Sequence, residues 1–371
     1  MAKSIYDAID TPALLIDQRI MMKNLAAMQK KADSMGVHLR PHTKTHKMPE
    51  IARLQVEMGA KGITVAKTGE AERMADYGLD DIFIANEIVG EMKWHRLARL
   101  SKKVKIAFGV DSPEVIESIE KVFAREDSMA YLRVEIETGE KRSGITEEKT
   151  FQALLKLIGQ SPHIVLEGIF SHEGHAYGAA SPEACQVLFE QAQMTTVRYA
   201  RIARTMGFAV PVVSVGSTPS LMHSTELLKE ITEIRPGTYV FMDAGQGSCI
   251  GTYEHCAASV LTTIISKPEG NRLIGDAGAK ALTAQSRGAG LCHTEGCGWI
   301  KGSKGVYVDH VFDEHAIIYN DELHQNLSIG HKVEIIPNHI CPVCNLYDKA
   351  YLVQDGEVVK ILDIACRGRL Q

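Results

Sequence analysis

Residues 104–138 read VKIAFGVDSPEVIESIEKVFAREDSMAYLRVEIET, and this stretch indicates the fold. Two apolar runs rich in β-branched and aromatic residues, 104–111 and 130–138, have the composition of buried strands. Between them, 112–124 repeats its apolar residues at helical spacing. A strand, a helix and a second strand in so short a length predict two parallel strands joined by a helical crossover.

The same rhythm extends in both directions, from about residue 10 to 245. It gives eight expected strands, at 13–17, 37–42, 62–67, 81–86, 104–111, 130–138, 164–172 and 212–216. Helical spacing and length mark the segments between them, such as 21–34, 69–77, 147–158 and 181–206. Eight such units predict a (β/α)₈ TIM barrel. A doubly wound sheet is the alternative, but no G-x-G-x-x-G follows the first expected strand.

The pattern changes after about residue 250, where short strand-like runs are separated by Gly, Asn, Asp and Pro. These runs are 258–265, 272–274, 305–308, 316–319, 332–336, 351–354 and 358–364. We therefore expect an α/β chain of two domains. A barrel would cover residues 10–248, and a mostly-β domain would combine 249–371 with 1–9.

Composition and charge exclude several classes of protein. The 371 residues include 41 Lys and Arg and 46 Asp and Glu, and the net charge of −5 gives no reason to expect nucleic acid or an anionic membrane as a partner. No apolar run is long enough to span a bilayer, and the opening MAKSIYDAID lacks the apolar stretch of a signal peptide. Eight cysteines are too few for a disulfide scaffold in this length. We expect a cytoplasmic protein whose notable cysteines serve metal or redox chemistry.

In a (β/α)₈ barrel the reactive side chains lie at the carboxyl ends of the strands. The second expected strand ends in RPHTKTHK at 40–47, which places Lys44 among other cations. Neighbouring positive charge and partial burial would both lower the pKa of the Lys44 amine, which favours the nucleophilic form that a Schiff base requires. A solvated basic loop is the alternative.

A second segment follows the last expected strand. Gly216, Ser217 and Thr218, before Pro219 and Ser220, stand where barrels commonly bind phosphate through backbone N–H groups and hydroxyls. An ordinary Ser/Thr-Pro turn gives the same pattern. Together with a Schiff-base lysine, however, the segment predicts a phosphorylated aldehyde cofactor.

Other candidates follow the sixth and seventh expected strands. Arg142 lies in a glycine-bracketed turn and could donate to an anionic cofactor oxygen, or form an ion pair at the surface. His172, His175 and Tyr177 could pack on a cofactor ring or move a proton. Polar side chains with a purely structural role would have the same pattern.

His339 and Cys341 stand two apart in IIPNHICPVC, residues 335–344. In an extended chain, residues two apart face the same side, so both could reach one metal ion. Imidazole and thiolate prefer Zn²⁺ to Mg²⁺ or Mn²⁺, and two or three protein ligands leave positions for water or substrate. The alternatives are a buried free cysteine beside a core histidine, and a redox pair with Cys344.

Five blocks, in this order, carry a resemblance: RPHTKTHK at 40–47, GEKRSG at 139–144, GSTPS at 216–220, RPGTYVFMD at 235–243 and HICP at 339–342. They resemble the D-serine dehydratase and D-threonine aldolase family, within the alanine-racemase-like, fold type III pyridoxal phosphate (PLP) enzymes. The resemblance implies a PLP-binding barrel followed by a β domain, active as a homodimer.

The resemblance also implies a role for each matched position. Lys44 would hold PLP covalently, and the PLP phosphate would bind Gly216, Ser217 and Thr218. Arg142 and Tyr177 would line the cofactor ring, and Tyr239 would lie on the phosphate side. The β-hydroxyl of the substrate would meet a divalent metal bound by His339 and Cys341.

The metal pair favours one branch of that family. Members resembling D-threonine aldolase pair the histidine with aspartate, which suits Mn²⁺ or Mg²⁺, whereas those resembling eukaryotic D-serine dehydratase use His-x-Cys and zinc. Cys341 favours the second branch, although NEIVG at 86–90 and NLYD at 345–348 resemble aldolase-type members. We therefore expect a lyase that converts D-3-hydroxy amino acids to a keto acid and ammonia. The alternatives are retro-aldol cleavage to glycine and acetaldehyde with His172 as base, an amino-acid racemase, and a non-catalytic PLP carrier.

Overall fold

The structure is a computed structural model that describes residues 5–371. The chain divides into two compact units. The first, the barrel unit, consists of residues 28–44, 49–237 and 368–371. The second, the β unit, consists of the described residues 5–27, 45–48 and 238–367.

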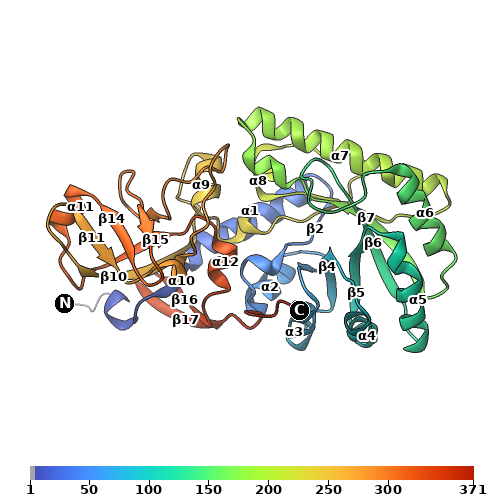
Figure 1. The fold of residues 1–371 in the computed structure, drawn as a ribbon, viewed down its shortest axis with the longest axis horizontal. Coiled ribbons are helices and arrows are strands. Elements are labelled where there is room, and N and C mark those ends of the chain that lie inside the picture. Colours follow the sequence, from blue (N-terminus) through green and yellow to red (C-terminus); the bar gives the residue numbers. More distant parts are fainter. Residues whose placement is uncertain (1–4) are drawn as a thin grey trace. The chain divides into compact units, whose positions relative to one another are not determined.

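Eight parallel strands form the sheet of the barrel unit (Figure 1). In spatial order they are β2 (His38–Leu39), β9 (Glu233–Ile234), β8 (Val212–Val215), β7 (Ile164–Ser171), β6 (Ala130–Ile136), β5 (Lys105–Val110), β4 (Asp81–Glu87) and β3 (Ile63–Val65). An isolated parallel bridge between His42 and Thr64 joins the two ends of this order. The sheet therefore curls round on itself, which confirms the predicted barrel.

Helices connect successive strands, as parallel pairing requires. They are α1 (Gln18–Ser34), α2 (Pro49–Glu57), α3 (Thr68–Asp76), α4 (Glu91–Leu100), α5 (Ile116–Arg125), α6 (Glu148–Gly159), α7 (Pro182–Thr205) and α8 (Thr218–His223), with 3₁₀ turns η2 (Thr43–Thr45), η3 (Pro113–Val115) and η4 (Gly174–Gly178). In α5, the spacing of Ile116, Ile119, Val122 and Phe123 makes one apolar stripe, and all of them are buried. Burial of such stripes is what holds the helices against the sheet.

One expected barrel strand belongs to the β unit instead. The strand β1 (Ala13–Asp17) pairs antiparallel with β10 (Ala258–Ser266) and parallel with β16 (Lys349–Gln354). The eighth barrel strand is β9, which has only two residues and was not predicted. A short apolar run has the same local composition in either sheet, so pairing with distant segments decides which sheet it joins.

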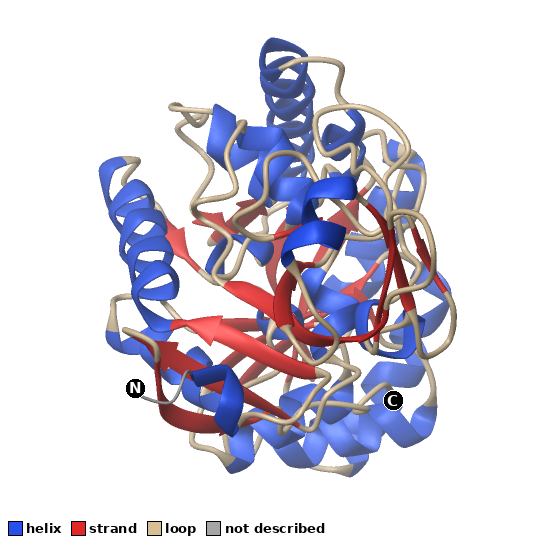
Figure 2. Cartoon of the chain, turned by 90° about the vertical axis from the view of Figure 1, so that its left-hand side faces the viewer, coloured by secondary structure: helices blue, strands red, loops and turns tan. Residues whose placement is uncertain are grey.

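The sheet of the β unit has nine strands. Its main order is β13 (His310–Val311), β14 (Ala316–Tyr319), β11 (Arg272–Gly275), β10, β1, β16 and β17 (Glu357–Asp363), while β15 (Lys332–Ile336) pairs with β10 and β12 (Trp299–Ile300). The short helices, distinguished from the strands in Figure 2, are η1 (Ile5–Ala8), η5 (Thr238–Val240), α9 (Ala244–Ile250), α10 (Ala279–Leu282), α11 (Asp321–Asn326) and α12 (Ile340–Cys344). The expected strand at 305–308 does not form, although Tyr307 makes an isolated bridge to Trp299.

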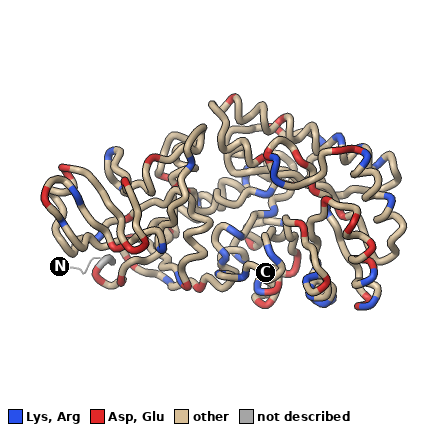
Figure 3. Tube along the Cα trace, in the orientation of Figure 1, with Lys and Arg blue, Asp and Glu red and all other residues tan. Residues whose placement is uncertain are grey.

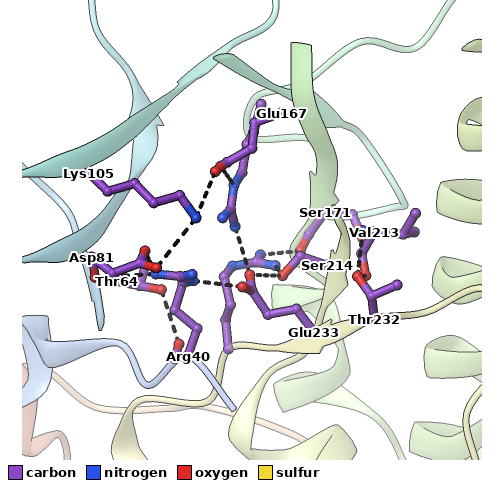
Figure 4. A network of polar contacts seen from close by, with 12 residues as sticks. Arg40, Thr64, Asp81, Lys105, Glu167, Ser171, Val213, Ser214, Thr232 and Glu233 are labelled. Atoms are coloured by element: carbon purple, nitrogen blue, oxygen red, sulfur yellow. Dashed lines mark hydrogen bonds and ion pairs between the residues drawn. The ribbon is translucent and has the colours of Figure 1, made fainter. Parts of the chain in front are cut away.

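A closed ring of ion pairs occupies part of the barrel interior (Figure 4). Each member pairs with the next at 2.6 to 3.4 Å, in the order Arg40, Asp81, Lys105, Glu167, Arg133, Glu233 and back to Arg40. Burial alone would raise the pKa of Glu233, but Arg133 and Arg40 hold it well below its usual range. The three positive and three negative charges cancel, and breaking one of the buried Arg–Glu pairs typically costs about 3–5 kcal/mol.

Acidic and basic residues are interspersed along the chain, as Figure 3 shows. Among residues 5–371, no helix combines the length and the apolar character needed to cross a bilayer. Among residues 5–371, no disulfide bond joins any two cysteines.

Candidate active site

Lys44 lies just after the second barrel strand, in the 3₁₀ turn η2, with its side chain half-buried. Thr43 Oγ1 donates a hydrogen bond to the Thr64 carbonyl at 3.0 Å, and the Lys44 N–H lies 3.5 Å from His42 Nδ1. These contacts fix the turn against β3. The lysine is therefore carried at the carboxyl end of the barrel strands, where barrel enzymes have their active sites.

Arg40, a cation of the same RPHTKTHK block, belongs to the ion ring. Its guanidinium is 2% exposed and pairs with Asp81 and Glu233 at 2.6 Å each. Neighbouring carboxylates therefore balance its charge, and an effect of Arg40 on the pKa of the Lys44 amine stays a prediction.

Two imidazoles share the electrostatic environment of Lys44. His42 is buried, and His172, which follows β7, has Nδ1 3.4 Å from the Gly216 carbonyl oxygen. Burial, and then the positive charge of Lys44, lowers the pKa of both His42 and His172 well below its usual value. Both rings are therefore neutral at pH 7, so each has a nitrogen lone pair. His42 was not predicted as a site residue, although it lies within the RPHTKTHK block.

The lowered histidine pKa values give the fold a defined pH dependence. In the unfolded chain, histidine has a pKa of about 6.5. At lower pH the unfolded state therefore binds protons that His42 and His172 do not bind in the native state. The free energy of unfolding should therefore fall between about pH 7 and 5, by up to about 1.4 kcal/mol per pH unit for each group. Urea unfolding at several pH values should show a shallower fall in His172→Gln than in the wild type. The control His310→Gln, at an exposed position, should keep the wild-type slope, and equal slopes in all three proteins would contradict the prediction.

Gly216, Ser217 and Thr218 form the turn between β8 and α8. The φ angle of Gly216 is 119°, a conformation that favours glycine, and its N–H donates to Glu173 Oε2 at 3.3 Å. Ser217 caps α8 by accepting from the Ser220 N–H. Thr218 Oγ1 is buried and has no hydrogen-bond partner among the described residues. Burying a hydroxyl without a hydrogen-bond partner costs free energy. A bound anion that accepted a hydrogen bond from the Thr218 hydroxyl would remove that cost.

Arg142 lies half-exposed beside two carboxylates. It pairs with Glu140 at 3.3 Å and with Glu135 at 3.8 Å. Burial, followed by a hydrogen bond to Glu135, raises the pKa of Glu87 to about 9. Arg142 is also one of the charges that lower the pKa of His172, so the two lie within electrostatic range. Tyr177 follows His172 closely in the sequence and is half-buried in η4.

Arg235 is a buried cation to which the sequence reasoning gave no role. It donates to Ser214 Oγ at 2.5 Å and to the Ser171 carbonyl at 2.6 Å. Burial lowers its pKa to about 10, so it remains protonated at neutral pH, and its charge contributes to the low pKa of His172. The RPGTYVFMD block contained this residue, but an arginine after a two-residue strand has no local feature that distinguishes it from a surface arginine.

The remaining predicted site residues, Tyr239, His339 and Cys341, belong to the β unit. Tyr239 is buried within η5. Cys341 Sγ lies 3.3 Å from Thr45 Oγ1 and 3.8 Å from Thr238 Oγ1. Thr45 directly follows Lys44 in the sequence, and Thr238 directly precedes Tyr239. Two hydroxyl groups therefore contact the sulfur.

The sequence predicts an extended backbone from His339 to Cys341, but only His339 is extended. His339 is extended, with φ −143° and ψ 106°, but Ile340 begins α12, so Cys341 lies in a first helical turn. Pro342 explains this, because its fixed φ and missing N–H suit the first turn of a helix. His339 Nδ1 lies 3.1 Å from Gln285 Oε1. Donation from Nδ1–H places the lone pair on Nε2, the tautomer that can bind a metal through that nitrogen.

No cluster of three or more His, Cys, Asp or Glu side chains that could hold a metal ion occurs within residues 5–371.

Comparison with known proteins assigns this architecture to a family. Residues 16–245 match the family described as alanine racemase, N-terminal domain. The chain belongs to the alanine-racemase-like, fold type III PLP enzymes. Residues 257–353 match a serine dehydratase domain family, which agrees with the resemblance drawn from the five sequence blocks.

Relatives match this PLP enzyme over nearly its whole length. It is 31% identical to D-threonine aldolase of Arthrobacter sp., over 97% of this chain and 93% of that protein. It is 33% identical to D-threo-3-hydroxyaspartate dehydratase of Delftia sp., over 90% of this chain and 91% of that one. These relatives are lyases, and the chain is an enzyme of that class.

Solved structures of D-threo-3-hydroxyaspartate dehydratase include two mutants similar to this enzyme. A cysteine-to-alanine mutant in the metal-free form has a TM-score of 0.91 at 29% identity, covering 97% of this chain and 98% of that chain. A histidine-to-alanine mutant has a TM-score of 0.91 at 28% identity, covering 97% and 96%. In that enzyme the altered histidine lies two positions before the altered cysteine, the same spacing as His339 and Cys341.

Proposed function

We propose that this enzyme is a PLP- and metal-dependent lyase of D-3-hydroxy amino acids that eliminates the β-hydroxyl, as a D-serine dehydratase does. The observation that carries the proposal is the His339-x-Cys341 pair, in which Nδ1 of the histidine contacts Gln285 and the sulfur contacts two hydroxyl groups. The 33% identity to a D-threo-3-hydroxyaspartate dehydratase supports elimination.

The barrel residues fit PLP. Lys44, half-buried at the end of β2, would hold the cofactor covalently. The Thr218 hydroxyl, buried without a partner among the described residues, would donate to the phosphate beside Ser217 and the Gly216 backbone. Arg142 and Tyr177 would line the ring, and Tyr239 would lie on the phosphate side.

The donor set fits a zinc ion better than a harder cation. Imidazole and thiolate suit Zn²⁺, whereas Mn²⁺ and Mg²⁺ prefer oxygen ligands. The metal-free form of the cysteine-to-alanine mutant in the related dehydratase supports a metal role for the equivalent pair. We therefore assign His339 and Cys341 as the proposed ligands of the divalent metal.

The reaction divides between the cofactor, the metal and the protein. PLP, held by Lys44, would spread the negative charge that develops at the substrate Cα, and a divalent metal held by His339 and Cys341 would supply a Lewis acid for the β-hydroxyl. Once the substrate amine had replaced it on the cofactor, the Lys44 amine would remove the Cα proton, and Arg142 and Arg235 would contribute positive charge nearby. Loss of the β-hydroxyl, return of Lys44 to the cofactor and hydrolysis of the released enamine would then give a keto acid and ammonia.

Retro-aldol cleavage is the second candidate, because the chain is 31% identical to a D-threonine aldolase over 97% of its length. In that reaction a base must remove the proton of the β-hydroxyl so that the Cα–Cβ bond can break. His172 is suited to that role, since its lowered pKa keeps its imidazole unprotonated at neutral pH.

A product assay separates the two reactions. Purified enzyme reconstituted with PLP and Zn²⁺ should convert D-serine, D-threonine and D-threo-3-hydroxyaspartate to keto acids and ammonia, and a chelator should stop it. Glycine and acetaldehyde from D-threonine would overturn elimination in favour of the aldolase. Interconversion of D- and L-amino acids that continues after chelation would favour a racemase, and tight PLP binding without turnover of any D-amino acid would favour a carrier.

Thr218→Val should weaken PLP binding about 10- to 100-fold. A hydrogen bond to a charged acceptor typically contributes about 1.5–3 kcal/mol, and about 1.4 kcal/mol is tenfold in affinity. Titration of the apoenzyme with PLP, followed by visible absorbance, measures the change. Thr205→Val removes a hydroxyl that donates to the Arg201 carbonyl at an exposed position of α7, so this control should bind PLP like the wild type. Unchanged affinity in Thr218→Val would contradict the phosphate assignment.

We further propose that the enzyme works as a homodimer in the cytoplasm. Family resemblance supports the dimer, and eight cysteines in 371 residues, too few for a disulfide scaffold, support a reducing compartment. Sedimentation analysis of the holoenzyme tests the first statement.

A further inference from the structure

We propose that Asp243 is a positioning residue for the metal pair: its buried carboxylate holds the peptide between His339 and Ile340, and thereby orients His339 and Cys341 toward one ion. The inference rests on the proposed function and deepens it, because it adds a residue that touches neither substrate nor cofactor. All of the groups involved belong to the β unit.

Both oxygens of the Asp243 carboxylate accept backbone hydrogen bonds, from two different helices. Asp243 is 0% exposed, Oδ1 accepts from the Gln246 N–H in α9 at 2.8 Å, and Oδ2 accepts from the Ile340 N–H at the start of α12 at 3.1 Å. The Ile340 N–H belongs to the peptide that follows His339. One carboxylate therefore fixes both the start of α9 and the backbone that joins the two proposed ligands.

Other bonds anchor the same segment. The Ala244 N–H donates to the Pro337 carbonyl at 2.9 Å, and the Gly245 N–H donates to the Asn338 carbonyl at 3.3 Å. Asn338 Nδ2 in turn donates to the Gly296 carbonyl at 2.8 Å. Residues 337–340 are thus held on two sides, and Asp243 provides a side-chain anchor for the backbone between the two proposed ligands.

The two backbone donors suit a carboxylate at this position. An ionised carboxylate accepts at both oxygens, whereas an asparagine amide has one accepting oxygen and an NH₂ group that cannot accept from a backbone N–H. Asp243→Asn therefore keeps the size of the side chain but loses one of its two backbone bonds.

Zinc binding by the PLP-loaded enzyme tests the inference. Groups that orient metal ligands typically change metal affinity about 10- to 100-fold, so equilibrium dialysis should show Zn²⁺ binding at least about tenfold weaker in Asp243→Asn. The thiolate absorption bands of the Co²⁺-substituted protein should change, whereas the visible absorbance of bound PLP should remain that of the wild type. If Asp243→Asn does not fold, Asp243→Ser, which preserves a helix-capping residue for α9, should show the same loss.

Asn320→Ala is the matched control. Asn320 caps α11, also in the β unit, by accepting from the Leu323 N–H at 2.8 Å. Its removal should cost stability but leave Zn²⁺ affinity and the Co²⁺ spectrum unchanged. Wild-type affinity and spectrum in Asp243→Asn would overturn the inference alone. Undiminished Zn²⁺ binding in His339→Ala would overturn the proposed metal site and the inference together.

Discussion

Lys44→Ala should eliminate the visible absorbance of bound PLP and lower the turnover of D-3-hydroxy amino acids by at least about 10³-fold. The effect is large because Lys44 is proposed both to hold the cofactor covalently and to remove the Cα proton, and a general base alone contributes about 10²–10⁴-fold. Absorption spectra after reconstitution and a coupled keto-acid assay measure both losses.

Lys102→Ala is the control for that variant, because Lys102 is an exposed lysine that follows α4 in the same unit. It should keep the cofactor colour and the wild-type rate. Thermal unfolding of both variants would show that the fold is retained. If Lys44→Ala kept its colour and rate, another amine would have to hold the cofactor.

Cys341→Ala should lose the bound metal and at least about a hundredfold of the elimination rate, while keeping the visible absorbance of PLP. A Lewis acid stabilises developing charge by several kcal/mol, and about 1.4 kcal/mol corresponds to a tenfold change in rate. Chelation of the wild type should reproduce the loss, and chelation of the variant should add nothing. Metal analysis and the product assay measure the two effects.

Cys297→Ala is the matched control for Cys341→Ala. Cys297 is a half-buried cysteine of the same β unit that forms no disulfide bond, so its removal tests for a general effect of losing a thiol. It should retain both metal and activity. Full activity in Cys341→Ala would exclude this sulfur as a ligand needed for the reaction.

Much of the fold could be predicted because the barrel signal is local and repeated. Each strand–helix unit, such as 104–124, has a β-rich run followed by an amphipathic stripe, and both periods are visible in the sequence. Assignment of β1 and β9 to their sheets could not be predicted in the same way. Ala13–Asp17 is a typical apolar strand whose partners, in β10 and β16, lie far away in the sequence. Glu233–Ile234 is too short to have a period.

The candidate site could be predicted only in part, for a related reason. Lys44, His172 and Arg142 follow predicted strands, so a barrel brings them to one end without further information. The compensation of Arg40 by Glu233 could not be read from the sequence, because the two residues are 193 positions apart. Asp243 was likewise given no role, since its contact with Ile340 spans 97 positions.

Borohydride reduction followed by peptide mass spectrometry tests the central claim most directly, since reduction makes the bond between PLP and its amine permanent. Digestion of the reduced holoenzyme should yield a single phosphopyridoxyl-modified peptide, with the added mass on Lys44. Modification of Lys47 or Lys67 instead, or no modified peptide from a protein that binds PLP, would contradict the assignment on which the proposed chemistry depends.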